Sequence, residues 1–271
     1  MSYPNANLIS ANLRTKKLGR NICRVEKTSS TNTLSKKLAR EGVEDGTLVI
    51  CREQTDGRGR GERTWHSDTE NSICMSVILR PPIAPELLPR YTPAFAVASV
   101  RAMAKFGVNA EIKWPNDIVA SGRKLCGILS EGGFYEDNYF IVCGIGINAN
   151  MHFGSSRSYI DTCPNDGKEL TKAAISIFDI TGKKIQREDF VAEMLNEAER
   201  VFAMCEGDAE YAILLDEYAQ HSLLLGREVT VYGKCEMYGI AVGFDGLGRL
   251  IVQTDEGEIV LDSGDVSVRL R

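Results

Sequence analysis

The spacing of hydrophobic residues predicts three helices in the 271-residue chain. Residues 29–42, "SSTNTLSKKLAREG", begin with hydroxyl and amide residues suited to helix capping, place Leu34 and Leu38 four residues apart and stop at Gly42. Residues 93–106 are almost entirely apolar, so a helix there must be well buried. Residues 188–205 carry an apolar stripe at helical spacing, which predicts a third, amphipathic helix.

Between these helices the pattern favours β-strands. Residues 46–51 ("GTLVIC") and 71–80 ("NSICMSVILR") are rich in strand-forming residues, and the Gly/Arg-rich stretch between them is the connecting loop. Residues 110–150 contain three further strand-like runs, "AEIKWPNDIVA", "RKLCGILSE" and "NYFIVCGIGINAN". The turns "SG" and "GGFYEDN" separate them, which predicts an antiparallel meander.

The pattern changes near residue 222, where short strands alternate with Asp/Gly turns. Five such runs follow in about 50 residues, "REVTVYG", "MYGIAVGF", "GRLIVQT", "EIVLD" and "DVSVR". We therefore predict an α+β protein in which a mixed or antiparallel sheet carries packed helices, with a small β-barrel appended. The expected domains are residues 1–221 and residues 222–271.

Composition and charge limit the partners, the cellular location and the metal sites that we expect for this protein. The formal net charge is −5, so binding to nucleic acid or to a membrane surface would need a local basic patch. The eight cysteines include no C-x-x-C pair and several lie in apolar runs, which indicates buried thiols in a reducing cytoplasm. The three histidines have no metal-ligand spacing, and the chain shows neither a signal peptide nor a long apolar run. We expect a cytoplasmic protein that does not bind membranes.

The most informative loop is "EQTDGRGRGERTWHS", residues 53–67. Its glycines let the backbone approach a ligand closely, while Arg58, Arg60 and Arg63 offer permanently charged forks that fit phosphate or carboxylate oxygens. Together they predict an anion cradle. A solvated hairpin tip and an RGG-like segment for single-stranded RNA are the alternatives. The single aromatic residue, Trp65, and the acidic net charge disfavour RNA.

Two further stretches can converge with this loop on one sheet face. The segments "KWPNDIV" and "RKLCGILSEGG" place polar residues in adjacent strands, namely Lys113, Trp114, Asn116, Asp117, Lys124 and Glu131. A lysine in an apolar strand such as "KLCGIL" is usually an edge residue, but beside an anion it can polarise a carboxyl or phosphoryl oxygen. The run "GIGINA" matches a dinucleotide fingerprint, yet no βαβ unit follows it.

Taken in order, "SSTN", "EQTDGRGRGERTW", "KWPNDIV", "KLCGILSE" and "GIGINAN" resemble the biotin protein ligases, from about residue 22 to the C-terminus. The resemblance implies a core like that of class II aminoacyl-tRNA synthetases and biotin ligases, with an SH3-like C-terminal barrel. It also implies a two-step reaction. Biotin and Mg-ATP give biotinyl-5′-AMP and pyrophosphate, and the biotinyl group then passes to a lysine of a biotin carboxyl carrier protein or a carboxylase biotinyl domain.

The same resemblance implies roles for individual residues. Biotin-binding residues would be Ser30, Thr31, Asn32, Gln54, Arg58, Gly59, Arg60, Lys124 and Gly127. Contacts to ATP or the adenylate would come from Arg58, Arg60, Arg63, Trp65, Asn116, Asp117, Lys124 and Asn148. Catalysis would depend on Lys124, Arg60 and Arg58. No protein cluster is expected to bind metal directly, and Mg²⁺ would be held through the phosphates, with Asp117 as a candidate ligand.

The chain departs from the family at one point. The usual loop reads G-R-G-R-x-G-R-x-W, whereas here Gly61 comes one place early and Glu62 stands where glycine is usual. About 20 residues precede the first expected strand, too few for the winged helix of the repressor members, so we expect no DNA binding. A homodimer through a sheet edge is a further expectation.

Two rival functions remain open at this stage. A lipoate ligase shares the core and the adenylate chemistry, but its R-R-x-S-G-G-G pattern is absent from the sequence. An RNA-binding module using the three loop arginines would show salt-dependent RNA affinity and no nucleotide turnover.

Overall fold

A seven-stranded mixed sheet forms the centre of the computed structural model, which describes residues 4–61, 63–135, 138–153, 173–233, 236–263 and 267–270. The strand order is β1-β2-β3-β7-β6-β5-β4, with β1 and β2 parallel and the other neighbours antiparallel. The strands are β1 (Ile22–Thr28), β2 (Leu48–Gln54), β3 (Ser72–Leu79), β4 (Glu111–Lys113), β5 (Asp117–Ala120), β6 (Arg123–Tyr135) and β7 (Asn138–Asn148).

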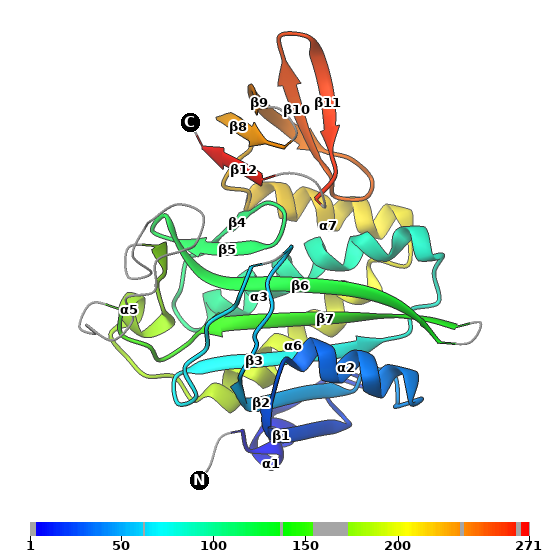
Figure 1. Cartoon of the computed structure of the whole chain (residues 1–271), viewed down its shortest axis with the longest axis vertical. Helices are drawn as coiled ribbons and strands as arrows, with labels where there is room; N and C mark the ends of the chain where they lie inside the picture. Colours follow the sequence, from blue (N-terminus) through cyan, green and yellow to red (C-terminus); the bar gives the residue numbers. More distant parts are fainter. Residues whose placement is uncertain are drawn as a thin grey trace.

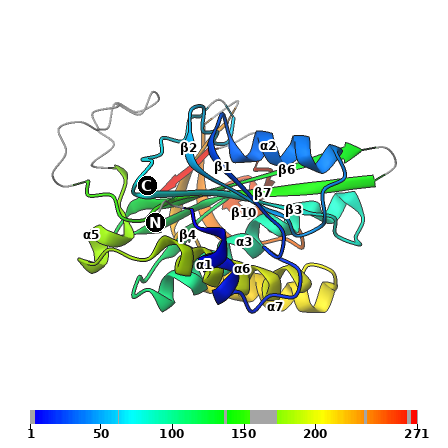
Figure 2. The same ribbon diagram turned by 90° about the horizontal axis from the view of Figure 1, so that it is seen from below.

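Helices cover the two faces of this sheet unequally. Figure 2 shows α2 on one side and α3, α6 and α7 on the other. The helices are α1 (Ala6–Asn12), α2 (Thr31–Arg40), the 3₁₀ turn η1 (Pro85–Arg90), α3 (Tyr91–Lys105), α5 (Ile177–Thr181), α6 (Arg187–Ala203) and α7 (Asp208–Gln220). The main core lies on the α3 and α6 side, where Ile73, Met75 and Val77 of β3 are fully buried. The other face is therefore only partly covered by helix.

That second face carries unusually small side chains along its middle strands. The pairing of β3, β7 and β6 aligns Cys74 with Gly146 and Gly146 with Gly127, and it aligns Ser76 with Gly144. We call Gly127, Gly144 and Gly146 the glycine floor. Because a glycine has no side chain, groups from α2 and from the Gly/Arg loop can approach the backbone here.

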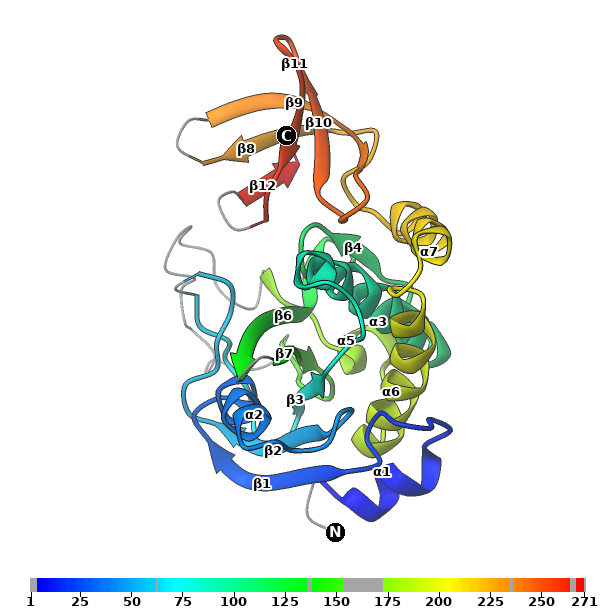
Figure 3. The same cartoon turned by 90° about the vertical axis from the view of Figure 1, so that its right-hand side faces the viewer.

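A second, five-stranded antiparallel sheet is built by the C-terminal residues in the order β11-β10-β9-β8-β12. Its strands are β8 (Glu228–Tyr232), β9 (Glu236–Phe244), β10 (Leu250–Thr254), β11 (Gly257–Leu261) and β12 (Ser267–Leu270). It stands at one end of the molecule, beyond α7 and the β4–β5 hairpin (Figures 1 and 3). The buried Trp114 indole joins the two parts by donating to the Gly248 carbonyl over 3.1 Å.

Most of the predicted elements are confirmed. The expected helices correspond to α2, α3 and α6, the Gly/Arg stretch does connect β2 and β3, and all five C-terminal strands form. The meander is also confirmed as β4 to β7, although the run at residues 110–120 divides into two strands around a cis Trp114–Pro115 bond. The predicted turn "GGFYEDN" is too long, since β6 continues to Tyr135.

The structure also bears on the composition arguments. The cysteines that the structure describes are free thiols, and five of them are buried while Cys23 is half-buried. Cys163 and Cys235 lie outside the described residues. Within the described ranges, no helix has the length and apolar character to cross a membrane.

Candidate active site

The Gly/Arg loop forms a narrow hairpin of its own. The Gly59 N–H donates to the Arg63 carbonyl over 2.7 Å, and the Trp65 N–H donates to the Gly57 carbonyl over 2.8 Å. A side chain at position 57 would overlap with the Trp65 backbone, so the close approach of the two arms requires glycine there. Glu62, the departure from the family pattern, lies outside the described residues.

The hairpin brings the Trp65 indole onto the glycine floor. A Cβ atom at Gly146 would overlap with the indole, and one at Gly127 would lie 3.2 Å from the ring atom Cζ3. The buried Cys74 thiol, paired across the sheet with Gly146, also interacts with Trp65. Burial raises the pKa of this thiol to about 11, so it is protonated at neutral pH.

Lys124 lies beside the indole, at the edge of the glycine floor. Its ammonium is 5.6 Å from the centre of the Trp65 ring, within cation–π range, and 2.7 Å from an oxygen of Asp117. A Cβ atom at Gly127 would lie 3.3 Å from the same ammonium. The structure thus brings together four residues that the sequence singled out, on two neighbouring strands and one loop.

Further cations lie near Lys124. We call this group of side chains the cation cluster, and its members are Lys113, Lys124, Arg60, Arg63 and Arg269. Burial is the main cause that lowers the pKa of Lys113, with added repulsion from Arg269, Lys124 and Arg63, while Asp117 opposes the shift. An excess of positive charge in a partly desolvated space is unfavourable by itself and becomes favourable when an anion enters. The cluster is therefore suited to binding phosphate or carboxylate groups.

Arg60 reaches from the loop to the C-terminal sheet. Its guanidinium donates to the backbone carbonyl of Ser263, which follows β11. Burial and the nearby Arg63 charge lower the pKa of Arg60, whereas Asp117 opposes the shift. The two parts of the chain thus meet at the cation cluster.

A separate group of hydrogen bonds forms at the start of α2. The Thr31 N–H donates to the Gln54 side-chain oxygen over 2.8 Å, and the hydroxyls of Thr31 and Ser76 lie 2.7 Å apart. The amide oxygen of Asn32 is 2.6 Å from the Ser76 hydroxyl. A side chain at Gly144 would overlap with this Asn32 amide, so glycine is required for the contact. Thr31 and Gln54 are thus brought together as the sequence predicts.

Glu131 links this group to the Gly/Arg loop. Its carboxylate accepts hydrogen bonds from Asn32 Nδ2 (2.9 Å), Lys36 Nζ (2.6 Å) and Arg58 Nη1 (3.1 Å). Burial opposes ionisation, but the bonds from Lys36 and Asn32 and the charges of Lys36 and Arg58 hold the pKa of Glu131 below its ordinary value. Arg58 therefore faces a carboxylate rather than the cation cluster.

Three other predicted site residues form hydrogen bonds that involve backbone groups of the protein. Ser30 begins α2 by accepting the Leu34 N–H at its carbonyl, and the Asn116 amide donates to the Ile128 carbonyl over 2.6 Å. The amide nitrogen of the buried Asn148 donates to the carbonyls of Lys124 and Ile175. These three residues hold the strands and the helix that carry the site.

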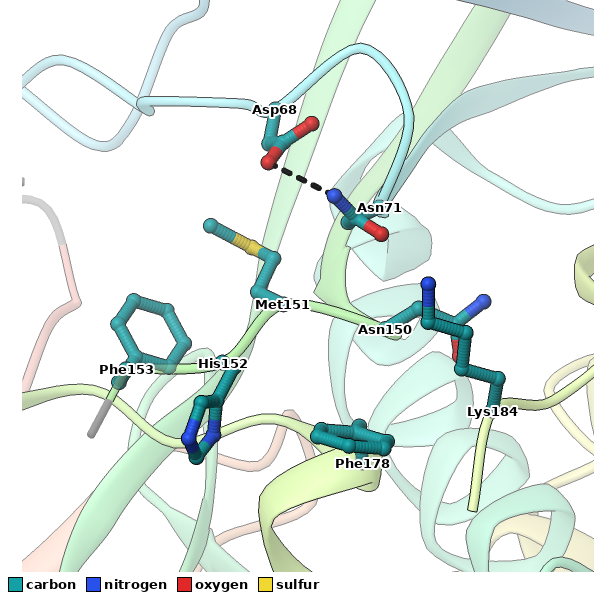
Figure 4. Close-up of a pocket in the computed structure, with 8 residues that line it drawn as sticks. All are labelled: Asp68, Asn71, Asn150, Met151, His152, Phe153, Phe178 and Lys184. Atoms are coloured by element: carbon teal, nitrogen blue, oxygen red, sulfur yellow. Dashed lines mark hydrogen bonds between the residues drawn. The ribbon is translucent and has the colours of Figure 1, made fainter. Parts of the chain in front are cut away.

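A cavity of about 370 Å³, which the sequence does not predict, lies beyond the end of β7 (Figure 4). Its lining residues are Asp68, Asn71, Asn150, Met151, His152, Phe153, Phe178 and Lys184. They come from three separate segments, so no local motif reveals them. In the described part of the chain, no group of three or more His, Cys, Asp or Glu side chains could hold a metal ion.

Comparisons with known proteins agree with this geometry. Residues 23–148 match the model of the Biotin/lipoate A/B protein ligase family, and residues 224–269 match the Biotin protein ligase C terminal domain. The "Bifunctional ligase/repressor BirA" of Bacillus subtilis is 35% identical over 94% of this chain and 76% of its own length. The "Biotin--[acetyl-CoA-carboxylase] ligase" of Mycobacterium tuberculosis is 30% identical over 91% of this chain and 88% of its own length.

Solved structures extend the similarity to three dimensions. The "Biotin protein ligase from Aquifex aeolicus in complex with biotin and ATP" has a TM-score of 0.76 and 26% identity, covering 93% of this chain and 100% of that one. The predicted fold class, a mixed-sheet core with a small C-terminal β-module, is thereby confirmed.

Proposed function

This chain belongs to the biotin protein ligase family, and from that premise we propose which of its residues carry each step of the reaction. The enzyme uses ATP to convert biotin into biotinyl-5′-AMP with release of pyrophosphate, and then transfers the biotinyl group to a protein lysine. The observation that supports the residue assignment best is the position of Lys124. Its ammonium lies beside Gly127 of the glycine floor and the Trp65 indole of the Gly/Arg loop.

Biotin would lie along the glycine floor, between two chemically different ends. The start of α2 and Gln54 offer hydroxyl and amide groups to the ureido ring. The cation cluster offers Lys124, Arg60 and Arg63 to the carboxylate and the phosphates. The Trp65 indole lies on the glycine floor, so it would have to move aside or lie next to the ligand when biotin and ATP bind.

In the first step, a carboxylate oxygen of biotin bonds to the α-phosphorus of ATP. The bond between that phosphorus and the α–β bridging oxygen breaks, and pyrophosphate leaves with the electron pair. Two anions approach each other and a third departs, so fixed cations lower the barrier by stabilising the spreading charge. Mg²⁺ supplies further charge neutralisation on the phosphates when bound, and Asp117 is the proposed carboxylate beside it.

In the second step, the neutral amine of the acceptor lysine attacks the acyl carbon of the adenylate. The acyl–oxygen bond breaks, AMP leaves, and the amine loses its proton to form the amide. The acceptor is a protein of the carboxylase class, and we propose that it is a biotin carboxyl carrier domain. The cavity next to Asn148, with Phe153 and Phe178 in its wall, is our candidate for the nucleobase.

Exchange of labelled pyrophosphate into ATP tests the first step directly. Purified protein with Mg²⁺ is compared in the presence of biotin, lipoate and no acid. We expect exchange that requires biotin. Exchange with lipoate alone would keep the mechanism and reassign the substrate, and no exchange with either acid would contradict the proposed activity.

A further inference from the structure

The polar groups between α2 and β6 form one continuous chain of hydrogen bonds that begins at Glu131. Each group in it offers a limited number of donors and acceptors, so the direction of every bond can be deduced. This inference rests on the proposed function, because it concerns how the ureido end of the biotin site is set up.

The direction of the first bonds follows from the surroundings of Asn32. Its Nδ2 lies 2.9 Å from the Leu129 carbonyl and 2.9 Å from Glu131, and both partners can only accept. The Asn32 oxygen must therefore face Ser76, which is 2.6 Å away. Since that oxygen can only accept, the single hydroxyl hydrogen of Ser76 is used here.

The next bond is then fixed as well. The Thr31 hydroxyl lies 2.7 Å from the Ser76 oxygen and 3.2 Å from the Gln54 side-chain oxygen. Because the Ser76 hydrogen points to Asn32, the shorter contact needs the Thr31 hydrogen, so Thr31 donates to Ser76. The Thr31 oxygen keeps lone pairs that can accept an N–H from a ligand. The Gln54 oxygen already accepts the Thr31 N–H over 2.8 Å, so the other end of that amide is an NH₂ donor.

We propose that Glu131 is a positioning residue that fixes the hydrogen-bond polarity of the ureido subsite. Through Asn32 and Ser76 it holds the Thr31 hydroxyl as an acceptor for a ureido N–H, while Gln54 faces the ureido carbonyl as a donor. Glu131 itself does not touch biotin. A further contact, to Arg58, ties the same carboxylate to the Gly/Arg loop.

Glu131→Gln is the sharpest test because it keeps the shape and removes one acceptor. The charged donors Lys36 and Arg58 attract the remaining oxygen, which turns the new NH₂ toward Asn32. Asn32 then has no favourable orientation: unflipped, its NH₂ faces the new NH₂, and flipped, its oxygen faces the Leu129 carbonyl, so either way a bond is left unmade and the hold on Ser76 weakens. A flip makes Ser76 donate to Thr31, which occupies a Thr31 lone pair that a ureido N–H would use. The Thr31 hydrogen is then left to the Gln54 side-chain oxygen, 3.2 Å away.

Isothermal titration calorimetry of the full-length protein with biotin measures the effect. We expect Glu131→Gln to raise the biotin Kd by about tenfold or more, the usual scale for a hydrogen bond left unmade. Glu53→Gln is the matched control. It removes an exposed carboxylate paired with Lys27 on the strand that ends at Gln54, and it should leave the Kd unchanged.

Two double-mutant cycles separate the polarity role from a general structural one. Thr31→Val already removes the hydroxyl at the end of the hydrogen-bond chain. In that background, Glu131→Gln should therefore change the biotin Kd by less than a further twofold. In an Arg58→Met background the full effect should persist, because that variant leaves Asn32 untouched. Ser76→Ala breaks the chain in the middle and should reproduce the loss if Glu131→Gln folds poorly.

The outcomes distinguish this inference from the function on which it rests. Additive effects of Thr31→Val and Glu131→Gln, or an unchanged Kd in Glu131→Gln, would overturn the positioning role while the wild type still binds biotin. A wild type that shows no heat of binding with biotin would instead overturn the proposed function.

Discussion

Lys124 reaches the active site because of a local irregularity in its strand. The register between β5 and β6 shifts between Ile118 and Val119, so that Val119 pairs with Lys124 while Ile118 pairs with Cys126. Such a bulge re-aims side chains next to it. It lets the Lys124 ammonium turn toward Gly127 and Trp65 while the adjacent Leu125 remains fully buried.

Replacing Lys124 with alanine should abolish most of the adenylate formation and leave the fold intact. Removal of one preorganised cationic donor typically costs about 10²- to 10³-fold in rate, which pyrophosphate exchange would report. The matched control is Lys17→Ala, which breaks a 2.8 Å ion pair with Asp45 on the surface. Exchange at the wild-type rate in Lys124→Ala, with a normal melting temperature, would show that the role is misassigned.

At the residue scale, the sequence predicts which charged residues gather better than it predicts the contacts of the uncharged ones. The arginines and Lys124 were singled out by their charge in glycine-rich or apolar surroundings, and Lys124, Arg60 and Arg63 lie in the cation cluster. Asn32 and Asn116 were also singled out, yet their amides bond to protein groups. A sequence does not reveal which polar side chains satisfy the backbone, because that depends on partners far along the chain.

At the scale of elements, the Gly/Arg hairpin is tied at both sides to other parts of the site. Arg58 binds Glu131 on β6, and Arg60 binds the Ser263 carbonyl beyond β11. Its own backbone has only a few cross-hairpin hydrogen bonds, and Gly61 adopts a positive φ of 66°. Segments with so few internal bonds open locally at low cost.

Trypsin should therefore cut at the loop arginines in the free enzyme, and cutting should slow when biotin and ATP are both bound. The adenylate would neutralise the arginines and hold the hairpin over the site. Mass spectrometry of the first fragments would locate the cuts at Arg58, Arg60 or Arg63. Equal cutting rates with and without both substrates would argue against ordering of the loop. The rate of cutting at sites outside the loop serves as the internal reference for trypsin activity.

The sequence predicted the elements whose apolar residues recur at a regular helical or strand spacing. It did not predict features that depend on packing against distant parts of the chain. Helix α7 escaped prediction because the exposed Ile213 stands within the apolar run "YAILL", which hides the i, i+3, i+7 spacing of the buried Tyr211, Leu214 and Tyr218. β6 continues through two glycines that read as a turn, since pairing with β7 overrides their weak strand preference.

At the scale of the whole molecule, the two sheets are joined at two described contacts, one of which lies at the active site. Arg60 donates to Ser263 at the cation cluster, whereas Trp114, which follows β4, donates to Gly248 next to Pro93 of α3 and Tyr211 of α7. We propose that the catalytic part ends near residue 221 and that residues 222–271 act as a separate unit. A cytoplasmic location and a homodimer also stay predictions.

The uneven helix cover of the central sheet has a thermodynamic consequence. On one face α3 and α6 complete a dry core, whereas on the other the described side chains directly against the glycine floor are Trp65, Lys124 and Asn32 of α2. A ligand bound there covers this face of the sheet as a packed helix would. It binds the native state and not the unfolded chain. Bound at about 100 times its Kd, it adds roughly 2.7 kcal/mol to the unfolding free energy. Biotin should thus raise the melting temperature by roughly 5–10 °C in differential scanning calorimetry.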